Sequence, residues 1–203
     1  MQKLRSPLSA FLVTLLLVII LAAFGPVERT LGTNVRLVYL HGAWVWTALL
    51  ALAGSALMGL PGAFLNHRLS QRWALALGQT GMLFWITYLP MSIWTMQANW
   101  NGLYLAEPRF RIGLDYAVIG ILLQAAILLV SNPRLSSVLD IAFFTSLAIS
   151  LTQAEQVMHP SSPILTSESL MIRAYFLILL VVSVTAGLFL TLILVRHRTD
   201  RTA

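Results

Sequence analysis

Long apolar stretches alternate with short polar connections along the whole chain. A helix needs about 20 apolar residues to cross a hydrocarbon core about 30 Å thick. Six stretches have this length and apolarity, over residues 7–24, 37–60, 73–96, 112–130, 135–154 and 170–195. The pattern predicts an all-α integral membrane protein, a six-helix transmembrane bundle that forms a single domain over residues 1–203.

The composition strengthens this prediction. Apolar residues make up 58% of the 203 residues and charged residues only 10%, with a mean hydropathy of +0.82. Soluble proteins carry about a quarter charged residues, and a soluble core cannot bury this much apolar surface. The lipid bilayer is therefore the expected surrounding. The absence of cysteine excludes disulfides and a C-x-x-C-H covalent haem attachment within this chain.

The positive charges predict an orientation. The formal net charge is +6, and the basic residues lie at helix ends, which favours anionic lipid over nucleic acid as their partner. With both termini cytoplasmic, the inner segments hold eight Lys and Arg residues and the outer segments five. We therefore expect a multi-pass protein of the cell inner or plasma membrane. The first stretch can alternatively be a cleaved signal, although its apolar run is long for that role.

The four histidines divide between the two sides of this topology. His41 opens the second span and His159 lies in the loop before the last, both on the outer side. His67 and His197 stand among arginines on the inner side, where solvated loop residues are expected. Trp44 follows His41 by one helical turn and shares its face. Interfacial packing explains His41 and Trp44 as well as ligand binding does, so the residue types alone leave both possibilities open.

The external connection over residues 97–111 mixes aromatic rings with charged groups. A porphyrin requires a flat apolar surface, one or two axial imidazoles, and cations for its propionates, for which the arginine fork is suited. Trp100 and Tyr104, expected one helical turn apart, can supply the surface. An amphipathic loop on the membrane, with Arg109 and Arg111 against lipid phosphates, explains the same residues.

Three external segments occur in an informative order. Residues 35–41 end in His41, residues 92–109 carry the aromatic connection, and residues 156–160 contain His159. In this order they resemble the haem-handling family of cytochrome c assembly membrane proteins, the CcmC and CcsA type. That family places a tryptophan-rich external motif between two external ligand histidines. The resemblance extends over most of the chain, and six spans with internal termini agree with the smaller members.

The tryptophan-rich motif is altered in this chain. The family's core reads approximately W-G-x-x-W-x-W-D-x-R, and the same spacing here reads Trp100-Asn101-x-x-Tyr104-x-Ala106-Glu107-x-Arg109. Trp and Arg are kept, while Tyr and Glu are near substitutes. Ala106 lacks a ring that would bury on the order of 200 Å². The alteration affects the surface thought to present haem to the next carrier more than the ligand histidines.

The resemblance implies a function and a set of site residues. It implies non-covalent binding of haem b at the outer face and haem transfer for cytochrome c assembly, without covalent catalysis. A haem chaperone or other cytochrome c assembly subunits are the implied partners. The implied site consists of His41 and His159 as axial ligands, Trp100 and Tyr104 as stacking surface, Arg36, Arg109 or Arg111 near the propionates, and Trp44 and Glu107 beside them.

Other functions remain open at this point. The chain can instead be a haem-free scaffold or interaction subunit of a membrane complex, with the altered motif as a docking surface. A transporter is a weaker alternative, suggested by Pro90 in the third span and by Asp140, which is expected near the inner interface of the fifth. A b-type cytochrome is disfavoured, because no two histidines share a span. No hydrolase, phosphate-binding or H-E-x-x-H motif occurs.

Overall fold

The fold is that of a computed structural model, which describes residues 2–158 and 164–202, with side chains described for residues 6–158 and 164–197. The described chain is all-helical, and its only β pairing is an isolated bridge between Glu28 and Gly32. The six helices are α1 (Gln2–Phe24), α2 (Val35–Phe64), α3 (Arg68–Trp100), α4 (Pro108–Val130), α5 (Pro133–Thr152) and α6 (Leu170–Thr202).

Five of these helices are long and apolar enough to cross a membrane. These are α1, α2, α4, α5 and α6, with spans over Ser6–Phe24, Val35–Phe64, Pro108–Val130, Pro133–Thr152 and Leu170–His197. The predicted all-α fold is therefore confirmed for the described residues, with five helices that could span a membrane, and the sixth span, expected within α3, stays a prediction. Polar residues such as Gln71 and Thr80 make α3 less apolar. Helix α3 packs against α2, α4, α5 and α6, so it has more helix neighbours than α1 or α4.

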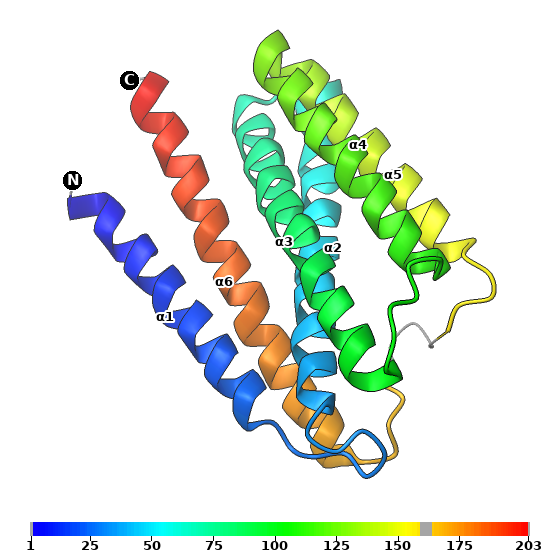
Figure 1. Ribbon diagram of the computed structural model, residues 1–203. Coiled ribbons are helices and arrows are strands. Elements are labelled where there is room, and N and C mark those ends of the chain that lie inside the picture. The colour runs from blue at the N-terminus through cyan, green and yellow to red at the C-terminus, as the bar shows by residue number, and fades with distance from the viewer. Residues whose placement is uncertain (1, 159–163, 203) are drawn as a thin grey trace.

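The helices run up and down in sequence and form three groups side by side (Figure 1). The pair α1 and α6 lies on one side, the pair α4 and α5 on the other, and α2 and α3 between them. Both termini lie at one end, here called the terminal end, together with the turns after α2 and α4 (Figure 1). The described parts of the connections that follow α1, α3 and α5 lie at the opposite end, here called the loop end (Figure 1).

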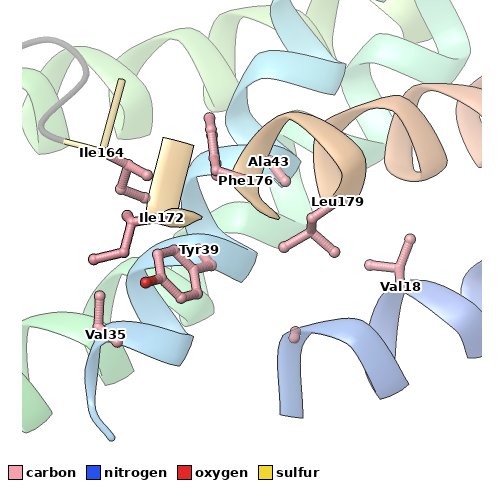
Figure 2. Packing of buried hydrophobic residues seen from close by; sticks show 9 residues of the cluster. Val18, Val35, Tyr39, Ala43, Ile164, Ile172, Phe176 and Leu179 are labelled. Atoms are coloured by element: carbon pink, nitrogen blue, oxygen red, sulfur yellow. The ribbon is translucent and has the colours of Figure 1, made fainter. Parts of the chain in front are cut away.

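A cluster of apolar side chains joins α1, α2 and α6 near the loop end (Figure 2). Val18 of α1, Tyr39 of α2 and Leu179 of α6 are each fully buried in it. The Tyr39 hydroxyl also donates to the carbonyl oxygen of Pro26 at 3.1 Å, and Tyr175 donates to Leu21 O at 2.5 Å. These contacts make α1 an integral part of the bundle.

Hydroxyl pairs join α6 to the central helices inside the bundle. Thr47 of α2 lies 2.8 Å from the hydroxyl of Ser183, and Thr80 of α3 lies 2.9 Å from that of Thr191. All four side chains are at most 2% exposed. Such hydrogen bonds between buried small polar residues are a common means of association between membrane helices.

The connection between α3 and α4 is shorter than the expected residues 97–111. Helix α3 continues to Trp100 and ends at Asn101, which adopts the left-handed conformation with φ of 52°. Helix α4 begins at Pro108, and the Glu107 carboxylate accepts the backbone N–H three residues on at 2.6 Å. The connection is thus residues 101–107. The expected helical-turn relation between Trp100 and Tyr104 is wrong, because Tyr104 lies beyond the helix end.

The prolines inside the helices do not break them. Helix α3 passes through Pro90 and α2 through Pro61 without interruption. Pro90, which suggested the transporter alternative, therefore does not interrupt the helix that contains it. A proline removes one intrahelical hydrogen bond, and neighbouring helices in a membrane bundle can support the backbone at that point.

Candidate functional site

A cavity of about 700 Å³ lies at the loop end between α2 and α3, closed by α4, the end of α5, α6 and the connections. It extends from Val38 to Leu49 on α2, which is about 17 Å along the helix axis. On α3 it extends from Trp85 to Trp100. Further walls come from Phe110 at the start of α4 and from Phe176 of α6. Volumes of about 300–1,000 Å³ are typical of sites for small molecules and cofactors.

His41 lines this cavity from the second turn of α2. Its Nδ1 atom lies 3.5 Å from the Ser92 hydroxyl of α3, at the long limit of a hydrogen bond. The imidazole also contacts the ring of Tyr88, with 5.8 Å between ring centroids. Proteins commonly orient a ligand imidazole by holding one ring nitrogen in this way, so that the other is directed to a metal. His41 is therefore positioned by α3 at the cavity wall.

Aromatic rings form much of the cavity lining, and two of them are fixed rigidly. Trp85 is 1% exposed, and its Nε1 donates to the carbonyl oxygen of Gly113 at 3.1 Å. Tyr88 packs edge-on against Trp85 with 4.9 Å between centroids. A Cβ at Gly113 would overlap the Tyr88 hydroxyl, so α3 and α4 approach closely only because residue 113 is glycine. These contacts fix the positions of the aromatic rings on this side of the cavity.

Charged and amide groups gather at the mouth of the cavity. Glu107 and Arg109 line it at the start of α4, and Asn99 lines it at the end of α3. Glu107 is 4% exposed, and its Oε1 atom has no hydrogen-bond partner among the described residues, nor has Asn99 Oδ1. Buried acceptors usually have a donor. The cavity therefore combines an apolar interior with a polar mouth that can bind the polar edge of a ligand.

Four of the predicted site residues line this one cavity, namely His41, Trp100, Glu107 and Arg109. Tyr104 contacts Trp100 edge-on with 5.6 Å between ring centroids, but it is 42% exposed and is not part of the lining. The predicted pair of aromatic rings therefore meets at the cavity mouth, with only Trp100 facing the interior volume.

Two further predicted residues hold helices together beside the cavity. The Trp44 Nε1 donates to the Thr87 hydroxyl at 2.8 Å, and its ring lies 4.4 Å from that of Phe84. The Arg36 Nε donates to the carbonyl oxygen of Gly25 at 3.0 Å. Neither Trp44 nor Arg36 is among the described residues that line the cavity. Arg111, predicted as an alternative to Arg109, is exposed and does not line the cavity either, and His159 lies outside the described residues.

The sequence interpretation missed Trp46, Trp85, Tyr88, Ser92 and Phe176, all of which line the cavity. The sequence spacing contains a signal that could have identified several of them. The lining positions 38, 41, 42, 45, 46 and 49 of α2, and 85, 88, 92, 95, 96 and 99 of α3, repeat at three and four residues. Each set lies on one face of its helix, and His41 identifies the face of α2 that lines the cavity.

A tight turn shapes the wall beside Leu31, which also lines the cavity. The Glu28 carboxylate accepts the backbone N–H groups of Leu31 and Thr30, both at 2.8 Å. These hydrogen bonds, that from Leu31 first, lower the pKa of the Glu28 carboxyl below its ordinary value. Gly32 closes the turn with φ of 59°, a conformation that favours glycine. The turn is thus held by a charged side chain.

The size and lining of the cavity suit a ligand with an apolar body, a polar edge and an atom that an imidazole can bind. No group of three or more His, Asp or Glu residues that would hold a metal ion occurs in the part of the chain that the structure describes. A haem iron needs only one or two axial side chains from the protein. Comparisons of the chain with protein-family models, with curated proteins and with solved structures found no match.

Proposed function

We propose that this protein binds haem b non-covalently at its loop end and passes it on during cytochrome c assembly. Haem is the cargo in this proposal. The observation that carries it is the convergence of His41, Trp100, Glu107 and Arg109 on one cavity of about 700 Å³. His41 stands 59 positions before Trp100 in the sequence, and the four residues come from α2, the end of α3 and the start of α4. Their meeting in one aromatic cavity supports a shared ligand.

Each part of the cavity has a role in this proposal. His41 supplies an axial imidazole to the iron, and Ser92 orients its ring. Trp85, Tyr88 and the other rings surround the porphyrin face. Arg109 at the mouth binds a propionate through its guanidinium fork. His159 is the proposed second axial ligand, as the resemblance implies.

The proposal includes an orientation and a partner. The loop end faces the outside of a cell inner or plasma membrane, and both termini are cytoplasmic. The polar mouth then opens toward the compartment where a haem chaperone or another cytochrome c assembly subunit would receive haem. The short connection over residues 101–107 lies at this mouth and is the proposed contact for that partner.

The test is an absorption spectrum of the detergent-purified protein, oxidised and dithionite-reduced, with and without added haemin. We expect a Soret band and sharp reduced α and β bands in the wild type. His41→Ala should weaken haem retention, and the double variant with His159→Ala should lose the low-spin spectrum. The matched control is His197→Ala, because His197 is exposed near the end of α6, far from the cavity. A wild type that stays colourless with haemin contradicts the proposal.

A haem-free scaffold is the second candidate function. The observation that favours it is the exposure of Leu103, Tyr104 and Leu105, which are 42–52% exposed in the connection at the cavity mouth. Such apolar side chains can contact another subunit directly. Under this alternative, Leu103→Ser combined with Leu105→Ser abolishes co-purification of a partner subunit from a protein that contains no haem. Haem content of the purified wild type distinguishes the two functions.

A further inference from the structure

A carboxyl group is buried far from the cavity, in the half of the bundle near the terminal end. Asp140 is the eighth residue of α5, about 10 Å along the helix from its start at Pro133. Its side chain is 5% exposed. It lies in the interface of α5 with α2 and α3, and the proposed function gives it no role. An ionisable side chain inside a membrane bundle is costly and usually has a function of its own.

Two small residues make room for this carboxyl group. A Cβ at Gly78 of α3 would lie 3.0 Å from Asp140 Oδ1 and 3.1 Å from the Ser55 hydroxyl oxygen of α2. The carboxyl and the hydroxyl therefore lie together against the backbone of α3. The other carboxyl oxygen, Oδ2, has no hydrogen-bond partner among the described residues.

The Ser55 hydroxyl beside Asp140 already has a hydrogen-bond partner. Ser55 donates its only hydroxyl proton to the carbonyl oxygen of Ala74, at 2.7 Å. Its oxygen can then only accept from the carboxyl group. An ionised carboxylate has no proton to donate, whereas a neutral carboxylic acid has one. With its proton on Ala74 O, Ser55 offers no donor to an ionised Asp140, so this arrangement favours the neutral acid.

The charged groups on the neighbouring helices do not offset an ionised form. Along α3 and α5 the nearest cations are Arg72 and Arg134, each about 9 Å nearer the terminal end. Beyond His41, α2 carries no charged or titratable side chain, and α4 has its charged residues up to Asp115 near the loop end. No described cation pairs with Asp140. A buried carboxylate without a counter-ion is far costlier than the neutral acid.

Polar side chains connect this carboxyl group to the terminal end. Ser137 precedes Asp140 by one helical turn on α5 and is fully buried, and its hydroxyl lies against Gly62 of α2. The Gln71 amide nitrogen donates to Gly62 O at 2.8 Å and to the Asn66 side chain in the turn after α2 at 2.9 Å. The Ser137 hydroxyl itself donates to the carbonyl oxygen of Pro133 at 3.0 Å. Ser137, Gln71 and Asn66, here called the polar seam, lie between the terminal end and Asp140.

We propose that Asp140 is a proton-binding site of the bundle, which exchanges its proton with water at the terminal end along the polar seam. The bound proton lets the carboxyl donate to Ser55 and keeps α5 packed against α2 and α3. When the proton leaves, the carboxylate loses this donor bond and attracts water into the seam. The contacts of α5 then loosen. The ligand of this site is thus a single proton, and the site is independent of haem.

The test is infrared spectroscopy of the haem-free protein in lipid, with carbon-13 in the aspartate carboxyl groups. The chain has only three aspartates, at positions 115, 140 and 200. At pH 7 we expect a labelled neutral-acid C=O band that shifts in deuterated water and that Asp140→Asn removes. Ser55→Ala should move the band to higher frequency without removing it, because the acid then lacks its acceptor. Asp115→Asn is the matched control, since Asp115 is also the eighth residue of its helix but is exposed.

Amide hydrogen exchange provides a second readout, which keeps the test valid if the infrared result for Asp140→Asn is affected by misfolding. Amide hydrogen exchange of α5 in the wild type should rise above that of Asp140→Asn at the same alkaline pH, because only the wild type can ionise there. The proposal is overturned if Asp140→Asn removes no neutral-acid intensity at pH 7, or if the labelled wild type shows only carboxylate bands. Neither result depends on whether the loop-end cavity binds haem.

Discussion

At the scale of single residues, the closest contact of the candidate site is that between Gly113 and Tyr88. A Cβ at position 113 would occupy the place of the Tyr88 hydroxyl, and Tyr88 is only 5% exposed. Gly113→Ala should therefore displace the ring and destabilise the fold by about 1–3 kcal/mol. Thermal unfolding in detergent measures this loss. Tyr88→Phe in the same chain should restore part of it, and an unchanged melting temperature in Gly113→Ala would refute the close approach.

Arg109 offers a second prediction at this scale, which rests on the proposed function. Arg109→Gln should weaken haem binding by about 1.5–3 kcal/mol, because a charge-assisted hydrogen bond to a propionate is lost. Titration of the purified protein with haemin measures the change. The matched control is Arg111→Gln, because Arg111 is exposed on the same helix turn and does not line the cavity. Equal affinities in the two variants would remove Arg109 from the site.

The predicted site residues divide according to the kind of information that identified them. His41, Trp100, Glu107 and Arg109 carry charge, an imidazole or a large ring in a recognisable order, and they meet in the cavity. Trp85 belongs to the same cavity but could not be predicted, because a tryptophan on a membrane helix packs equally well against lipid or another helix. Which face of α3 meets α2 is decided by tertiary packing, which a single sequence does not reveal.

At the scale of elements, the start of α4 links helix stability to the cavity mouth. The Glu107 carboxylate caps the helix by accepting from Phe110 N at 2.6 Å. Glu107→Ala should cost about 0.5–2 kcal/mol and fray the first turn, which carries Arg109. Hydrogen exchange at residues 110–112 should accelerate. Glu107→Gln keeps an acceptor oxygen, so the same amides should exchange close to the wild-type rate in this variant. Equal amide exchange rates in the wild type and both variants would argue against capping by Glu107.

The sequence predicted the helices better than their ends. Apolar runs identify the helices because each needs enough apolar length to cross the bilayer. The end of α3 was misjudged because the helix continues through polar residues to Trp100 and stops only where Asn101 turns left-handed. The start of α4 depends on a side-chain cap at Glu107. Such local hydrogen bonds depend on atomic positions, which hydropathy does not describe.

At the scale of the whole molecule, the alternation of the six helices predicts which ends face each side of the membrane. The chain contains no cysteine, so single cysteines can report the sides without background. Leu103, which is 51% exposed at the loop end, and Leu65, which is 76% exposed at the terminal end, are suitable positions. A membrane-impermeant maleimide should label Leu103→Cys in intact cells and Leu65→Cys only after permeabilisation. Labelling of both in intact cells would contradict the proposed orientation.

The pairing of the first helix with the last has a consequence for how the protein is made. The hydrogen bond from Tyr175 to Leu21 joins residues 154 positions apart, and α1 packs more extensively against α6 than against α2. At about 5–20 residues per second, the ribosome needs roughly 8–30 s to synthesise the intervening chain. Throughout that interval α1 lies in the bilayer without α6, the helix against which it packs most extensively. A nascent chain that stops before α6 leaves this helix exposed to the membrane proteases and chaperones that detect unassembled segments.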